Sequence, residues 1–113
     1  MSDCLFCKFV KNEIEVKKVF EDDLMIIIKD INPQAKNHFL MIPKEHFALL
    51  DMMTAAQAAN LGKCLATVST LKDLLELKGG YRLVINQGSD AGQTVHHVHI
   101  HILSGQQMQW TPA

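Results

Sequence analysis

Short apolar segments separated by polar turns make up the chain as far as Pro43. Apolar side chains at spacings of three and four predict a short helix over 4–12. Two strands are predicted over 16–20 and 24–29, joined by an acidic turn. The second of them is apolar at successive positions, so we expect both of its faces to be covered. An Asn-Pro step then marks a loop, and the pattern predicts a third strand over 38–43.

One long helix is predicted in the middle of the chain. Thr54 and Gln57 fit a capping box, with a hydroxyl at the N-cap and a glutamine three residues later. Apolar residues recur at helical spacing from there to Leu75, and Gly79 and Gly80 follow as a C-terminal stop. Such a helix would be about 35 Å long at 1.5 Å per residue.

The last part of the chain returns to a strand pattern. A fourth strand is predicted over 81–86, a glycine-containing loop over 87–93, and a fifth strand over 94–103. One long helix between the third and fourth strands, with a short N-terminal helix, predicts an α+β fold with a five-stranded, largely antiparallel sheet. We expect residues 1–113 to form a single domain, since a chain of this length buries one core.

Composition narrows the class of protein. Hydrophobic residues make up 48% and charged residues 20%, which is typical of a globular chain, and the formal net charge is −1. This balance argues against nucleic acid as a partner, while it permits a small phosphate-bearing ligand. No spanning apolar run and no signal sequence is evident, so we expect a cytoplasmic protein without a membrane partner. Three cysteines suggest reduced thiols or metal ligands rather than disulfides.

Histidine is concentrated near the C-terminus, where four of the six fall within residues 96–101. In a strand, residues two apart share a face, so His97, His99 and His101 form a row. His96 falls on the other parity and lies outside that row. The remaining residues of that parity must face the core and thereby fix the register: Val98, Ile100 and Ile102.

Three interpretations of the row are open from the residues alone. It is a solvated polar face, a metal site, or a site for phosphoryl or nucleotidyl transfer. The outer two Cα atoms of the row lie about 13 Å apart in a strand, so two neighbours could share an ion but all three could not without a strong bend. The flanking loop favours transfer chemistry: Gly88 and Gly92 permit close backbone approach, and Asn86 and Thr94 add neutral donors.

The segment 97–103 matches the His-φ-His-φ-His-φ-φ signature of the histidine triad (HIT) superfamily. The resemblance covers nearly the whole chain and is to the nucleotide-binding branch typified by histidine triad nucleotide-binding proteins, bacterial-type with CxxC. The segments that carry it are 20–23, 30–35, 38–40, 42–44, 86–90, 92–95 and 107–112.

This resemblance implies a homodimeric purine nucleoside phosphoramidase that releases a nucleoside monophosphate such as AMP. The nucleophile would be His99, which forms a covalent nucleotidyl-histidine intermediate because imidazole is both nucleophile and leaving group. His97 would orient it and His101 would contact phosphate, while Thr94 supplies a hydroxyl where the family more often has serine. Alternatives are a dinucleoside polyphosphate hydrolase, a regulatory nucleotide-binding module, and an unrelated metalloenzyme.

The resemblance also implies a nucleotide site. Asp30 would bind the ribose hydroxyls; the alternative is that it simply begins an ordinary turn. The nucleoside pocket residues, some of which could be plain core residues, are Leu5, Phe6, Phe9, Ile28, Ile31, His38 and Leu40. The phosphate-side residues, some of which could be ordinary turn residues, are Asn86, Gly92, Gln93, Thr94, Val95, His99 and His101. Trp110, in the tail, would reach the partner's active site.

Finally, the resemblance implies a structural zinc ion that the chemistry itself does not require. The ligands would be Cys4, Cys7, His46 and His97, a closed tetrahedral set. The Cys-x-x-Cys spacing alone is weak evidence, because a short helix carries two cysteines by chance. Cys64 lies on the apolar helix face and is expected to be a small core residue.

Overall fold

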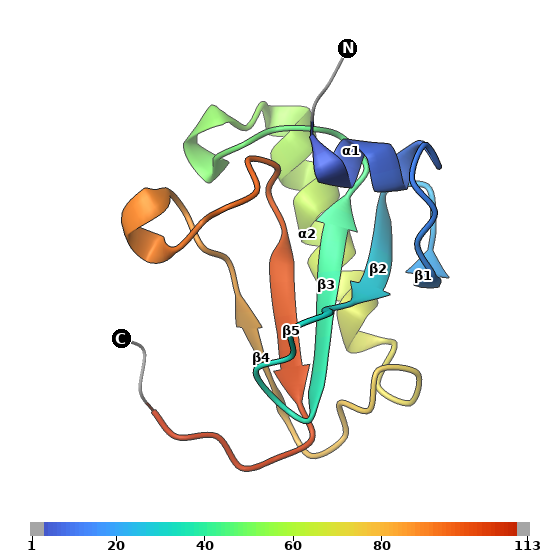
Figure 1. The fold of residues 1–113 in the computed structure, drawn as a ribbon, viewed down its shortest axis with the longest axis vertical. Coiled ribbons are helices and arrows are strands. Elements are labelled where there is room, and N and C mark those ends of the chain that lie inside the picture. Colours follow the sequence, from blue (N-terminus) through green and yellow to red (C-terminus); the bar gives the residue numbers. More distant parts are fainter. Residues whose placement is uncertain (1–3, 111–113) are drawn as a thin grey trace.

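A computed structural model describes residues 4–110 (Figure 1). Met1–Asp3 and the predicted tail residues Thr111 and Pro112 lie outside the described residues. The helices are α1 (Leu5–Val10) and α2 (Ala55–Ser69), with two short 3₁₀ helices, η1 (Leu50–Met52) and η2 (Ser89–Ala91). The strands are β1 (Lys18–Glu21), β2 (Met25–Lys29), β3 (Asn37–Pro43), β4 (Tyr81–Val84) and β5 (Ile100–Ser104).

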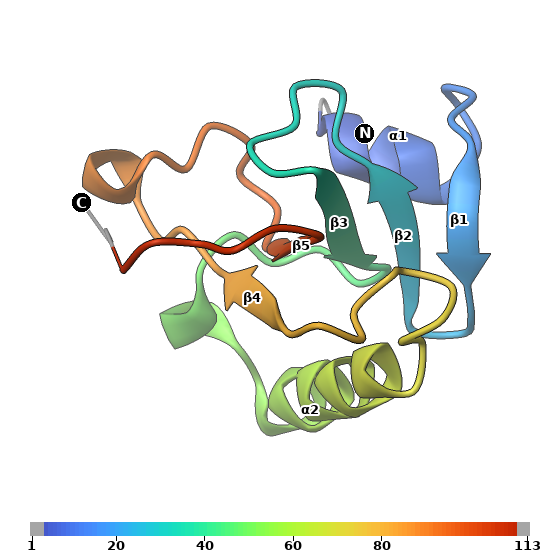
Figure 2. The ribbon, with the colours of Figure 1, turned by 90° about the horizontal axis from the view of Figure 1, so that it is seen from below.

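The strands form one sheet in the order β1-β2-β3-β5-β4, and every neighbouring pair is antiparallel. Figure 2 shows α1 and α2 on opposite faces of this sheet. The α+β fold with a five-stranded antiparallel sheet, one longer helix and a short N-terminal helix is therefore confirmed. Within residues 4–110, no helix has the length and apolar character needed to cross a lipid bilayer.

Each face of the sheet carries its own apolar cluster. The larger one packs against α2, which contributes Leu61, Cys64 and Val68. The smaller one packs against α1 through Phe6. Strand β2 supplies both, because Met25 and Ile27 face α2 whereas Ile26 and Ile28 face α1. The prediction that this strand is covered on both faces is confirmed. Cys64 is a core residue, as expected.

Helix α2 begins as predicted and ends early. The capping box of Thr54 and Gln57 is present with both of its hydrogen bonds. The predicted extension to Gly79 is wrong, since the helix ends at Ser69. Hydroxyl side chains there compete for backbone carbonyls: Thr67 donates to the carbonyl of Lys63, and Ser69 to that of Ala66. The next backbone hydrogen bonds span three residues instead of four, from Thr70 to Thr67 and from Leu71 to Val68, as in a 3₁₀ turn that ends the helix.

The segment that follows α2 still serves the core. Leu75 and Leu77 are fully buried although they lie beyond the helix. A short turn carries them, closed by a 2.8 Å hydrogen bond from the Leu77 N–H to the Lys72 carbonyl, with Glu76 left-handed at φ 58°. The apolar spacing that predicted a longer helix therefore marks buried positions of a turn.

Strands β4 and β5 are shorter than predicted. β4 ends at Val84 instead of residue 86, and β5 begins at Ile100 instead of residue 94. β3 ends at Pro43. The Pro43 carbonyl accepts a hydrogen bond from the His97 side chain instead of from the backbone of a neighbouring strand. Residues 94–99 lie outside the sheet, and Val98 donates its N–H to the loop residue Phe47.

Candidate functional site

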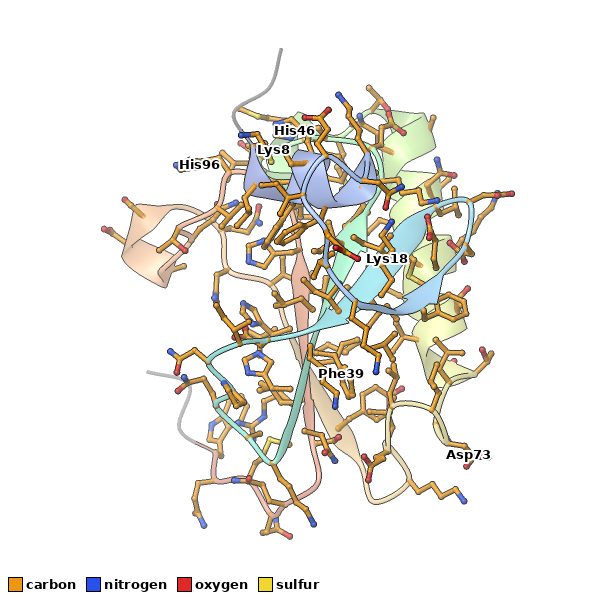
Figure 3. The ribbon with its side chains drawn as sticks, turned by 45° about the vertical axis from the view of Figure 1, so that its right-hand side comes forward. Lys8, Lys18, Phe39, His46, Asp73 and His96 are labelled. Atoms are coloured by element: carbon orange, nitrogen blue, oxygen red, sulfur yellow. The ribbon has the colours of Figure 1, made fainter. Side chains whose placement is uncertain are left out.

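The histidine row survives although two of its members precede β5. The Phe6 ring of α1 packs edge-on against His97 and His99, with centroids 6.0 and 5.0 Å apart. The His99 and His101 rings lie 5.2 Å apart. The alternate residues Val98, Ile100 and Ile102 are fully buried, as predicted. His96 is exposed, near the α1 end of the molecule (Figure 3).

The proton on His99 is fixed by the backbone. Its Nδ1 lies 2.7 Å from the carbonyl oxygen of His97. A carbonyl only accepts, so Nδ1 carries the hydrogen and Nε2 keeps its lone pair. The side chain is 8% exposed. His99 therefore presents one nucleophilic nitrogen from a largely dry position.

The four predicted zinc ligands lie together in what we call the cysteine–histidine cluster: Cys4, Cys7, His46 and His97. Their ligand atoms all fall within 4.8 Å of one another. The Cys7 sulfur is 3.2 Å from His46 Nδ1 and 3.5 Å from His97 Nδ1, and these two nitrogens are 3.1 Å apart. Tetrahedral zinc with ordinary bond lengths requires about 3.5 Å for S···N and about 3.3 Å for N···N. The geometry fits the ion.

The protonation of His97 also suits a metal. Its Nε2 donates to the Pro43 carbonyl at 2.7 Å, which leaves the Nδ1 lone pair directed at the cysteines. Burial lowers the pKa of His97, assisted by the nearby His46 and His99 and opposed by the bond to Pro43, and the resulting pKa of about 4 leaves the ring neutral at pH 7. His46 is exposed beside α1 (Figure 3), which places the cluster at the molecular surface.

A second group, the carboxylate–histidine cluster, consists of Asp30, His38 and His101. His38 Nδ1 accepts the N–H of Gln34 at 3.0 Å, so the ring hydrogen is on Nε2. That Nε2 lies 2.9 Å from His101 Nδ1 and 3.4 Å from the Asp30 carboxylate. His101 Nδ1 therefore accepts, and its own hydrogen is on Nε2.

Both imidazoles of this cluster favour the neutral form. Burial lowers the pKa of His38, against the opposing charge of Asp30. Burial lowers the pKa of His101 as well, assisted by His99 and His38 and again opposed by Asp30. The site thus holds uncharged rings that donate hydrogen bonds in fixed directions.

The predicted nucleoside pocket residues divide into a packed wall and exposed positions. Phe6, Ile28 and Leu40 belong to the apolar cluster under α1, with Phe9 and Val95 packed against it. Three others extend from the surface: Leu5 is 42% exposed, Ile31 101% and Trp110 84%. Their predicted contacts stay predictions.

Asp30 is used locally as well, since its Oδ1 accepts the Asn32 N–H at 2.8 Å. Its other oxygen faces His38. Asn86 lines a pocket of about 180 Å³ together with His38 and His101. Thr94 is exposed.

The glycine loop is held by a buried glutamine. Gly88 and Gly92 have φ of 85° and 88°, a conformation that glycine adopts without penalty. Gln93 is 5% exposed, and its amide accepts the Gly88 N–H and donates to the Ala48 carbonyl, both at 2.8 Å. The Gln93 side chain therefore fixes the shape of the loop by hydrogen bonding to backbone groups.

Three partners of the site could not be predicted from the sequence. The Pro43 carbonyl and the Gln34 N–H fix the histidine tautomers, and backbone groups are present at every residue. Gln87 accepts the N–H of Leu50 at 2.6 Å and joins the loop to η1. A glutamine beside a glycine was the one available cue, and it is too common to predict such a bond.

Comparison with known proteins agrees with this geometry. The HIT domain profile matches residues 11–108. The "14 kDa zinc-binding protein" of Zea mays is 39% identical over 98% of this chain and 88% of its own. A "HIT family hydrolase" of Clostridium thermocellum superimposes with TM-score 0.90, 39% identity and coverage of 98% of this chain and 97% of its own. A "histidine triad nucleotide-binding protein" of Candida albicans gives 0.80 at 33% identity, covering 96% and 83%. This chain belongs to the HIT domain family.

Proposed function

We propose that this protein hydrolyses purine nucleoside 5′-phosphoramidates, including adenylated amines, to a nucleoside monophosphate and an amine. The observation that carries the proposal is the hydrogen bond from His99 Nδ1 to the His97 carbonyl, which leaves Nε2 free to attack. The similar solved structures, which include a hydrolase and a nucleotide-binding protein, support the same class of reaction.

The reaction takes place in two displacements. His99 Nε2 bonds to phosphorus as the P–N bond to the amine breaks, and the leaving amine takes up one proton from solvent. Water then attacks phosphorus in the nucleotidyl-histidine, the electron pair of the P–N bond returns to His99 Nε2, and the attacking water releases one proton to solvent. We propose that His101 Nε2–H donates a hydrogen bond to a phosphoryl oxygen, since its ring lies 5.2 Å from that of His99 and its Nδ1 is already occupied by His38.

The other predicted residues receive roles around this centre. The apolar wall of Phe6, Ile28 and Leu40 receives the nucleoside, and Asp30 binds the ribose hydroxyls. The loop from Asn86 through Val95 surrounds the phosphate. We propose a cytoplasmic homodimer in which Trp110 of one protomer reaches the partner's site.

The cysteine–histidine cluster is proposed to hold structural zinc. When bound, zinc supplies no step of the hydrolysis, because its four tetrahedral positions are filled by protein ligands. Cys4 and Cys7 hold α1, and His97 keeps its carbonyl aimed at His99.

The test compares wild type with His99→Ala on an adenosine 5′-phosphoramidate that carries a fluorescent amine. We expect release by wild type and a loss of at least a thousandfold in the variant, with AMP binding retained. His96→Ala is the matched control, since His96 is an exposed neighbour outside the row, and it should turn over normally. Persistent turnover by His99→Ala would remove the nucleophile assignment. AMP binding without turnover in wild type would indicate a binding module.

A further inference from the structure

Phe6 occupies a special place between the two halves of the site. In the sequence it lies between the two cysteines of the cysteine–histidine cluster, Cys4 and Cys7. Its ring, 5% exposed, meets the His99 ring edge-on at 5.0 Å and an interplanar angle of 88°. The same short helix thus contributes two metal ligands and the side chain that packs against the nucleophile.

The helix that carries Phe6 has little stability of its own. α1 spans six residues, well below the length at which an isolated helix is stable in water. The Cys4 sulfur caps its first turn by accepting the Cys7 N–H at 3.4 Å. Polar contacts from α1 to the site run through these cysteines, at 3.2–3.5 Å from the His46 and His97 nitrogens. Such sulfur contacts are weak, whereas metal–thiolate bonds are strong.

His97, in contrast, is anchored without a metal. Its Nε2 bonds to the Pro43 carbonyl, and its carbonyl bonds to His99, so both ends of this link lie within the sheet region. Loss of the ion would therefore loosen α1 far more than it would move His97. Of the two groups that contact His99, Phe6 is therefore the one whose position depends on the ion.

We propose that Phe6 is a positioning residue that couples occupancy of the cysteine–histidine cluster to the placement of His99. With Cys4 and Cys7 bound to an ion, the turn between them is rigid and the Phe6 ring is held against His99. Without it, α1 and Phe6 move, and both the nucleophile and the apolar wall lose their support. The nucleotide part of this inference rests on the proposed function, whereas the coupling to His99 does not.

Coupling between two sites is reciprocal. If the ion tightens AMP binding by some factor, AMP must tighten binding of the ion by the same factor. We expect a factor of about five or more, the lower end of common coupling energies. A ligand-independent sign of the same coupling is a shift of the His99 ring resonances when the ion is added.

The experiment uses the full chain, with Co²⁺ as a spectroscopic stand-in for Zn²⁺ and AMP as the nucleotide probe. AMP affinity is measured by calorimetry in the metal-free and Zn²⁺-loaded protein, and ion affinity is measured with and without AMP. His99 ring resonances are followed by NMR in the Zn²⁺ titration. The variant is Phe6→Leu, and its matched control is Phe20→Leu, the same change in the cluster on the α2 face.

We expect Phe6→Leu to keep the thiolate-to-cobalt absorption band, which shows that the cluster is intact, and to reduce the coupling factor below about twofold. Phe20→Leu should keep the full factor. Equal AMP affinity with and without ion, together with unshifted His99 resonances, would overturn the coupling. Full coupling in Phe6→Leu would overturn the role of Phe6. If wild type binds no AMP, the proposed function fails, and the His99 resonances alone decide the coupling.

Discussion

Two clusters flank His99, and they use the same side chain in opposite ways. In the cysteine–histidine cluster, a backbone carbonyl accepts a hydrogen bond from His97 Nε2–H, so Nδ1 offers a lone pair. In the carboxylate–histidine cluster, a backbone N–H donates a hydrogen bond to His38 Nδ1, so Nε2 must carry the ring hydrogen. A neutral imidazole has one donor and one acceptor, so His97 Nδ1 offers a metal its lone pair, whereas His38 Nε2 does not.

The difference shows that proximity of ligand-type residues does not define a metal site. The atoms of Asp30, His38 and His101 lie as close together as those of the other cluster. For His38 to bind an ion through Nε2, it would have to lose its only hydrogen or break its bond with Gln34. The backbone therefore makes the cysteine–histidine cluster compatible with a metal ion, whereas it directs His38 Nε2–H to a hydrogen bond with His101.

The largest expected effect is on metal affinity. Cys7→Ser should weaken Co²⁺ and Zn²⁺ binding by about 10²- to 10³-fold, because the roughly 10–16 kcal/mol of such sites is shared among four ligands. Competition with a chromophoric chelator measures it.

The matched change in the other cluster is His38→Gln, which should leave the ion affinity within about twofold. Equal losses in both variants would mean that the two clusters do not differ in this way.

The next effect is on stability against pH in the metal-free protein. Unfolded His97 binds a proton below its ordinary pKa of about 6.5, whereas folded His97 does so only near a pKa of about 4. The unfolded state holds more protons in this window, so stability falls as the pH falls through it. The expected loss is roughly 3 kcal/mol, measured by urea unfolding between pH 7 and pH 4.

His97→Gln removes this titration and should flatten the curve, because glutamine can still donate to the Pro43 carbonyl. The lowered pKa values of His38 and His101 act in the same direction, so some slope should remain. An unchanged slope in His97→Gln would assign the effect to the carboxylate–histidine cluster instead.

A smaller effect is expected on turnover. His38→Leu removes the donor to His101 Nδ1 and frees His101 to exchange its tautomer, so kcat on the phosphoramidate should fall about tenfold, the size of one hydrogen bond. His38→Gln places an amide N–H near the former Nε2 and should recover most of the rate. Zn²⁺ content should be unchanged in both variants. A rate for His38→Leu equal to that of wild type would show that His101 needs no such partner.

How far the sequence predicted this molecule depends on the kind of signal. Apolar alternation found the strands and the buried parity of Val98, Ile100 and Ile102, because burial acts on side chains one by one. The same signal failed at the end of α2, where Leu75 is buried in a turn and not in a helix. Hydroxyl competition at Thr67 and Ser69 decides that boundary, and hydropathy does not register it.

The sequence predicted which residues form the cysteine–histidine cluster, but it did not predict the protonation of their rings. The family resemblance predicted one shared metal site for four residues, and their ligand atoms do lie together: Cys4, Cys7, His46 and His97. Which nitrogen of each histidine carries hydrogen depends on backbone groups such as the Pro43 carbonyl, whose position follows from the fold alone. The predicted contacts of residues at the surface depend on a ligand or a second protomer.

The smallest expected effect is a change in stability that should leave both clusters unaffected. Glu76 is exposed and left-handed at φ 58°. It borders one pocket with Asp30 and His38, but its side chain makes no hydrogen bond or ion pair among the described residues. Glu76→Gly should stabilise the protein by about 0.5–1 kcal/mol, because glycine adopts this conformation without the steric penalty of a side chain. Thermal unfolding measures it, while Co²⁺ spectra and turnover should stay unchanged. If this variant altered either, the effects of Cys7→Ser and His38→Leu could reflect global stability, and the division of labour between the clusters would lose its support.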